Sequence, residues 1–118
     1  MTVEVTGLTK QLRTVEKSRV DDLLISAVDE TLKRVFKEQG AKVIYDYFGN
    51  KFHLKPEEIA ERSEVFSAGL RRLLASAGPV IEKMILKNLY RKLELKFVEK
   101  EGYEFSDYIK ELKKRCNR

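Results

Sequence analysis

Apolar residues between Gly78 and Phe97 fall on two opposite sides of an expected helix. At about 100° per residue, one side carries Val80, Ile81, Met84, Ile85, Leu95 and Val98. The opposite side carries Leu86, Tyr90, Leu93 and Phe97, with Leu89 at its edge. A helix with two apolar stripes has to be covered on both of them. The pattern therefore predicts a central helix, or a helix that gives one side to its own core and the other to a partner.

Helical spacing of apolar residues recurs in four more segments. The expected helices span 20–39, 41–48, 64–77 and a final stretch from Ser106, and a short helical turn begins at Pro56. Glycine ends the first helix, and Gly78 suits the left-handed residue that follows the helix over 64–77. Short connections between such helices are typical of bundles. We therefore predict an all-α fold, a single-domain bundle of about five helices.

Two parts of the chain repeat one pattern. A Leu-Lys-Arg-Val-Phe run from Leu32 precedes Gly40, and a Leu-Arg-Arg-Leu-Leu run from Leu70 precedes Gly78 with the same eight-residue spacing. Two helical hairpins of similar plan explain the repeat. Any amphipathic helix that ends in a glycine explains it equally well, and both readings stay open.

The first seventeen residues differ from the rest. Val3 and Val5 alternate with polar residues, as in a strand, but no second strand is available to pair with them. We expect 1–17 to form an extended or poorly ordered N-terminal arm, with a single helical domain over 18–118.

The composition is typical of a soluble helical protein. The chain of 118 residues is 42% hydrophobic and 36% charged, which is ordinary for a soluble helical protein. Its longest uncharged run has nine residues, far short of a membrane span. A single cysteine fits the reducing cytoplasm, and the abundance of Lys and Glu hints at a heat-adapted source. We expect a cytoplasmic protein that does not enter a membrane.

Residues that could carry chemistry are scattered. His53 is the single histidine, and Cys116 lies far from it, so no zinc-ligand spacing exists. Carboxylates gather in three places, at Asp21/Asp22, at Asp29/Glu30 and at Glu57/Glu58/Glu61. Neighbouring residues of a helix point about 100° apart, so these acids do not converge as paired catalysis requires. The first and third groups lie where helix N-termini favour negative charge, so capping explains them better. We expect no enzyme, no metal site and no cofactor.

The basic excess suggests one alternative. The net charge is +5, and five residues could contact a polyanion: Arg71, Arg72, Lys83, Lys87 and Arg91. A row of this kind can follow phosphates. Acids are interleaved with it, however, and mixed-charge helix surfaces are common. Nucleic-acid binding through this face is therefore the alternative function, and a solvated surface is the simpler interpretation.

The second apolar stripe suggests a partner. Leu86, Tyr90, Leu93 and Phe97 are spaced four, three and four residues apart, as in a coiled-coil seam. The final helix could fold back over this seam through a turn at Gly102. The seam could equally meet its symmetry mate in a homodimer, or another protein, with Tyr90 and Phe97 as aromatic anchors.

Packing and capping residues carry a family resemblance. The runs Gly40-Ala41-Lys42-Val43-Ile44-Tyr45-Asp46-Tyr47 and Gly78-Pro79-Val80-Ile81-Glu82, with Val65-Phe66, Gly69-Leu70 and Leu73-Leu74 between them, resemble a family of small archaeal all-helical domains. These domains are described as output domains of signalling proteins. The resemblance covers about residues 18–112. It implies an archaeal, cytoplasmic interaction or regulatory module and transfers no catalytic residue. We therefore expect a non-enzymatic domain that acts by self-association or partner association.

Overall fold

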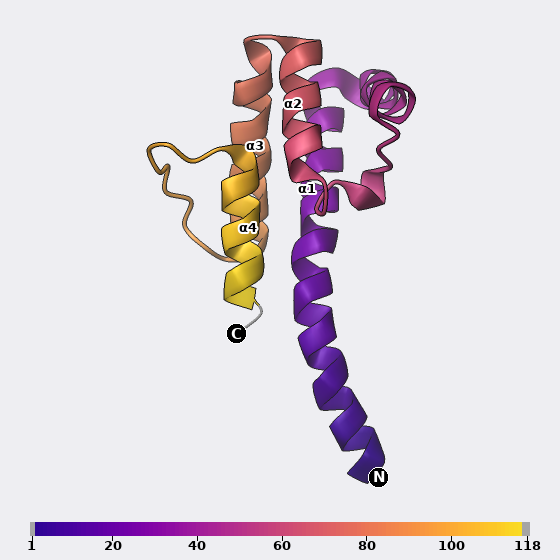
Figure 1. The fold of residues 1–118 in the computed structure, drawn as a ribbon, viewed down its shortest axis with the longest axis vertical. Coiled ribbons are helices and arrows are strands. Elements are labelled where there is room, and N and C mark those ends of the chain that lie inside the picture. The colour runs from indigo at the N-terminus through magenta and orange to yellow at the C-terminus, as the bar shows by residue number, and fades with distance from the viewer. Residues whose placement is uncertain (1, 117–118) are drawn as a thin grey trace.

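The protein is all-helical, as the sequence predicts. The computed structural model describes the backbone of residues 2–116 and the side chains of residues 19–115, and these residues form no strand (Figure 1). Residues 2–116 form four α-helices and one short 3-10 helix, so the predicted count of about five helices is not confirmed: α1 (Thr2–Phe52), η1 (Pro56–Glu58), α2 (Ser63–Leu74), α3 (Ala77–Lys92) and α4 (Phe105–Cys116). The sequence predicts an extended or poorly ordered arm over 1–17; the backbone of this part is helical from Thr2 onward, and the side chains of 1–18 lie outside the described residues.

A bend divides α1 into two parts. Lys37 has a φ of 65° and a ψ of 177°, which is the non-helical conformation inside this helix. The expected helices 20–39 and 41–48 are thus parts of one bent helix, and the break lies three residues before Gly40. After the bend the chain turns aside and is seen nearly end-on in Figure 1, so it does not fold back as a hairpin. The hypothesis of two similar hairpins is therefore wrong.

The backbones of α2 and α3 come close together at the turn that joins the two helices. Ala75, with a φ of 51°, ends α2, and its N–H donates to the Arg71 carbonyl at 2.8 Å. Gly78 is already inside α3, so the prediction that it takes the left-handed conformation is wrong. A Cβ on Gly78 would lie 2.8 Å from the Arg71 Cα. The glycine is therefore required because the two helix backbones touch at this point.

Helix α3 is shorter than the predicted central helix. Glu94 has a φ of 58°, its N–H donates to the Arg91 carbonyl at 3.0 Å, and the Leu95 N–H donates to the Tyr90 carbonyl at 2.8 Å. These two bonds form a Schellman motif, the usual end of a helix. Leu95, Phe97 and Val98 consequently belong to the loop before α4, and their predicted positions on the helix are wrong.

A single apolar core joins all the helices. Helix α1 packs on α3 and α4, and α2 packs on α3 and α4. Phe66 of α2 is fully buried; its ring stacks on Phe48 of α1 at 5.1 Å and lies 5.9 Å from Phe105 of α4. Both sides of α3 are covered, as its pattern predicts, since Ile85 and Leu86 are both buried.

Candidate functional site

The second apolar stripe of α3 lies under its own chain. Leu86 and Tyr90 are 4% and 5% exposed, and Leu93 and Phe97 are half-buried. The Phe97 ring lies 5.2 Å from the Tyr90 ring and 5.4 Å from the Tyr108 ring of α4. Of the two arrangements that the sequence leaves open, the structure has the intramolecular one. These four side chains are used inside the fold, so they offer a second subunit little surface.

The loop between α3 and α4 is anchored over this stripe by polar contacts. The Lys100 N–H donates to the Tyr108 hydroxyl oxygen at 2.8 Å, and the Lys100 ammonium contacts the Glu111 carboxylate at 2.7 Å. Lys83 of α3 forms an ion pair with Glu99 of the loop. These contacts therefore hold the loop over the aromatic side chains of Tyr90, Phe97 and Tyr108.

A buried carboxylate lies between α2 and α3. Glu82 is 4% exposed; it accepts a short hydrogen bond from the Ser67 hydroxyl and an ion-paired one from Arg71 at 3.0 Å. Arg71 also contacts Glu104 at 3.0 Å, and its hydrogen bond to Glu82 raises the pKa of the guanidinium. A buried charge needs such partners because its desolvation is costly. The cluster fastens α2, α3 and the start of α4 together.

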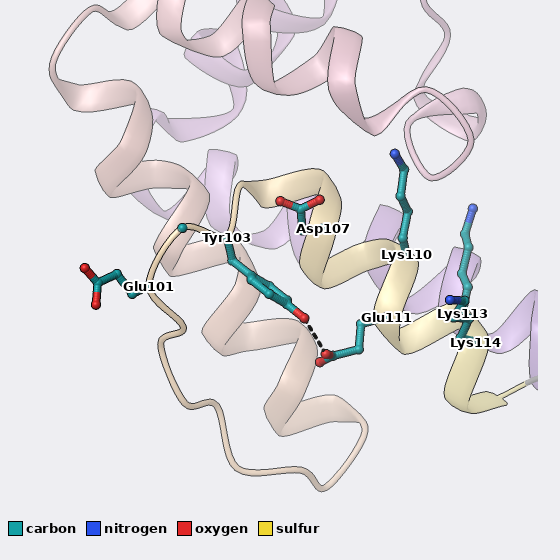
Figure 2. A pocket seen from close by; sticks show the side chains of 8 residues that line it. Glu101, Tyr103, Asp107, Lys110, Glu111, Lys113 and Lys114 are labelled. Carbon is teal, nitrogen blue, oxygen red and sulfur yellow. Dashed lines mark hydrogen bonds between the residues drawn. The ribbon is translucent and has the colours of Figure 1, made fainter.

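An open depression of about 790 Å³ lies between the loop and α4 (Figure 2). Tyr103 reaches across it and donates to Glu111 at 2.9 Å. The hydrogen bonds from Lys100 and Tyr103 lower the pKa of Glu111 below its ordinary value. Lys110 is paired with Glu64 at 2.6 Å. Three acids (Glu101, Asp107 and Glu111) and three lysines (Lys110, Lys113 and Lys114) line this depression, so its lining carries no net charge.

The five candidate polyanion contacts do not form one free surface. Arg71 is paired with Glu82 and Glu104, and Lys83 is paired with Glu99. Arg72, Lys87 and Arg91 are exposed. Three of the five predicted contacts are thus exposed to a ligand, and the other two form ion pairs with carboxylates of the same chain.

The other candidate groups stay apart from one another. His53 is exposed, and its carbonyl accepts a hydrogen bond from Arg62 at 3.0 Å. Glu58 accepts from the Lys55 N–H at 2.9 Å and so caps η1, as predicted for that group of acids. The same prediction is wrong for Asp21 and Asp22, because they lie inside α1 and not at its start. The Cys116 side chain lies outside the described residues. Among the side chains of 19–115, no cluster of His, Cys, Asp and Glu is placed to hold a metal ion.

The feature that sequence reasoning missed is the bend in α1. Lys37 is an ordinary helix former, and the flanking residues are helix formers as well. The available signal was Gly40, since a Cβ there would lie 2.6 Å from the Phe36 Cβ across the bend. The sequence therefore marks the neighbourhood of the break but not the residue that bends.

In the part of the chain that the structure describes, no helix combines the length and the apolar character that crossing a membrane requires. Comparison with protein-family models, with curated proteins and with solved structures finds no match to this chain.

Proposed function

We propose that this protein is a non-enzymatic interaction domain, of the kind used as a signalling output module in the cytoplasm, and that it works by association. Its first partner is a second copy of the same chain. The proposal takes up the resemblance to small archaeal helical domains, which covers about residues 18–112. It does not use the seam of α3, because those side chains are occupied within the fold.

The length of α1 is the observation that supports this proposal. The helix has 51 residues, and its N-terminal part continues past the ends of α2, α3 and α4 along the longest axis of the molecule (Figure 1). An isolated helix of fewer than about 15 residues is marginal in water. A helical segment that leaves its own bundle is therefore best explained by a partner that stabilises it.

The sequence of this segment suits a second copy. Val5, Leu8, Leu12 and Val15 are spaced three, four and three residues apart. This spacing is the seam of a coiled coil, in which two helices bury their apolar positions against each other. A homodimer closed by two-fold symmetry is the simplest assembly of such a segment.

A pair of double substitutions tests the proposal. We expect Leu8→Glu/Leu12→Glu to convert a dimer into a monomer in light scattering over a range of concentrations. The control, Thr6→Glu/Thr14→Glu, adds the same charge to the same helix outside the seam and should leave the dimer intact. A wild-type chain that is monomeric at every concentration, or equal behaviour of the two variants, would contradict self-association through this segment.

Nucleic-acid binding, the alternative, has less support. It relies on Arg71, Arg72, Lys83, Lys87 and Arg91, and two of these five are paired with carboxylates. Measurement of binding to duplex and single-stranded oligonucleotides at low salt tests it directly, because phosphate contacts are strongest there.

A further inference from the structure

The bend in α1 is strained. Lys37 has a φ of 65° with a ψ of 177°, a region that is essentially reserved for glycine. Every other residue of α1 keeps helical backbone angles, so the whole change of direction falls on this one residue. A lysine in a straight helix is free of this cost, since it is among the good helix formers.

Gly40 is required by the same bend. In a straight helix the Cβ atoms of residues four apart are about 5–6 Å from each other. In the bent helix a Cβ on Gly40 would lie 2.6 Å from the Phe36 Cβ, an atom next to the backbone that cannot move aside alone. Lys37, Glu38 and Gln39 are exposed, so straightening the helix here removes no buried side chain from the core.

The two sides of the bend are held together by contacts that a second copy can supply. Val20, Leu24 and Leu32 from the first part of α1 are fully buried in the common core. Glu30 accepts from Asn88 at 3.1 Å and from Lys92 of α3 at 2.9 Å. The two hydrogen bonds of Glu30, and the packing of α1 on α3 and α4, join residues before the bend to residues after it. A second copy offers identical partners.

We propose that α1 straightens at Lys37 and that two copies of this chain exchange the part of α1 before the bend, so that residues 19–36 of each copy pack on residues 38–115 of the other. The exchanged dimer repeats all the contacts of the monomer and relieves the strain at two bends. Hinges of this kind favour domain swapping. This exchange goes beyond the proposed function, because it places the contact in the core and not in the segment before residue 18.

Three substitutions in the full chain test whether the strain at the bend controls dimer formation. Gly40→Ala disfavours the bend and favours a straight helix, so we expect the dimer to bind at least about tenfold more tightly. Lys37→Gly relieves the bend and weakens a straight helix, so we expect the dimer to bind at least about tenfold more weakly. Gly49→Ala is the control: a Cβ on Gly49 meets nothing within 4 Å, and the dimer constant should not change. Sedimentation equilibrium measures all three.

A cross-linking measurement on the wild-type chain identifies the exchange itself. Light and nitrogen-15-labelled copies are unfolded, mixed and refolded together, and a carbodiimide then couples the Lys92 ammonium to the Glu30 carboxylate, which are 2.9 Å apart. In an exchanged dimer, about half of the coupled peptide pairs carry one light and one heavy peptide, as random pairing of equal amounts requires. In a dimer without exchange, every coupled pair has a single label.

The outcomes separate this inference from the proposed function. Mixed-label pairs in the dimer fraction, together with opposite shifts for Gly40→Ala and Lys37→Gly, support the exchange. Single-label pairs alone, or a Gly40→Ala dimer constant equal to that of Gly49→Ala, overturn it. A dimer that Leu8→Glu/Leu12→Glu dissolves but that has single-label pairs keeps the proposed function and rejects the exchange. A dimer that persists in the Leu8→Glu/Leu12→Glu variant and has mixed-label pairs supports the exchange and rejects the proposed function.

Discussion

Gly78→Ala tests how closely α2 and α3 approach each other. An added Cβ would lie 2.8 Å from the Arg71 Cα, 3.1 Å from the Arg71 nitrogen and 3.1 Å from the Leu70 carbonyl oxygen. All three are backbone atoms, so no rotation of a side chain can relieve the contact. The helices have to separate, which loosens the packing around the buried Glu82 and Leu70.

The expected loss follows from two opposing effects. Alanine gains about 1 kcal/mol over glycine inside a helix. Overpacking against a rigid neighbour costs about 1–3 kcal/mol, and backbone contacts lie at the upper end of that range. We therefore expect Gly78→Ala to lower the free energy of unfolding by about 2 kcal/mol. For a chain of this length that is a decrease of about 8 °C in Tm.

Thermal and urea unfolding followed by circular dichroism measure this change, with Gly49→Ala as the matched control. Gly49 is exposed in α1 with nothing near its missing Cβ, so the same chemical change should raise stability by up to about 1 kcal/mol. If both variants are stabilised equally, the close approach of α2 and α3 is refuted.

Three further changes test other contacts. Glu94→Gly should stabilise the fold by about 1 kcal/mol in urea unfolding, because a left-handed residue ends α3 and glycine adopts that conformation without strain; Glu94→Ala should give no such gain. Arg71→Met should cost about 2 kcal/mol, less than for a fully buried pair because the Arg71 side chain is 44% exposed, and Glu82→Gln in the same chain should recover part of the loss. Burial of Tyr45, and then its hydrogen bond to Asp29, raise the pKa of the Tyr45 hydroxyl above that of an unfolded chain. The contribution of Tyr45 to the free energy of unfolding is therefore complete below about pH 10 and declines as the pH rises further. Tyr45→Phe should therefore lose stability less steeply than the wild type above that pH, and parallel urea midpoints would contradict this.

The elements of the fold and their apolar faces could be predicted from local pattern. The buried Val20, Leu24 and Leu32 repeat at helical spacing, and so do Phe66 and Leu70, because one face of each helix has to leave water. The need to cover α3 on two sides follows from the same periodicity, and α2 starts within one residue of the predicted position. These features depend on residues a few positions apart, which a sequence displays directly.

The ends of helices could not be predicted in the same way. Ala75, Glu94 and Lys37 all have positive φ although none is a glycine, so no residue type announces the turns they make. Gly78 and Gly40, which the sequence predicts at helix ends, instead permit close approaches, Gly78 to the backbone of α2 and Gly40 across the bend. The cost of each unusual conformation is offset by distant packing, and no local pattern records it.

What the sequence by itself determined is the all-helical class, the amphipathic face of each helix and the lack of a recognisable catalytic motif, because these depend on composition and on spacing along one chain. What only the tertiary structure decided is which partner covers each face. The seam of Leu86 and Tyr90 is closed by α4 and its preceding loop, and α1 bends at Lys37. The physical reason is that an apolar stripe requires burial but does not specify against what, and the choice depends on shape complementarity between segments far apart in the chain.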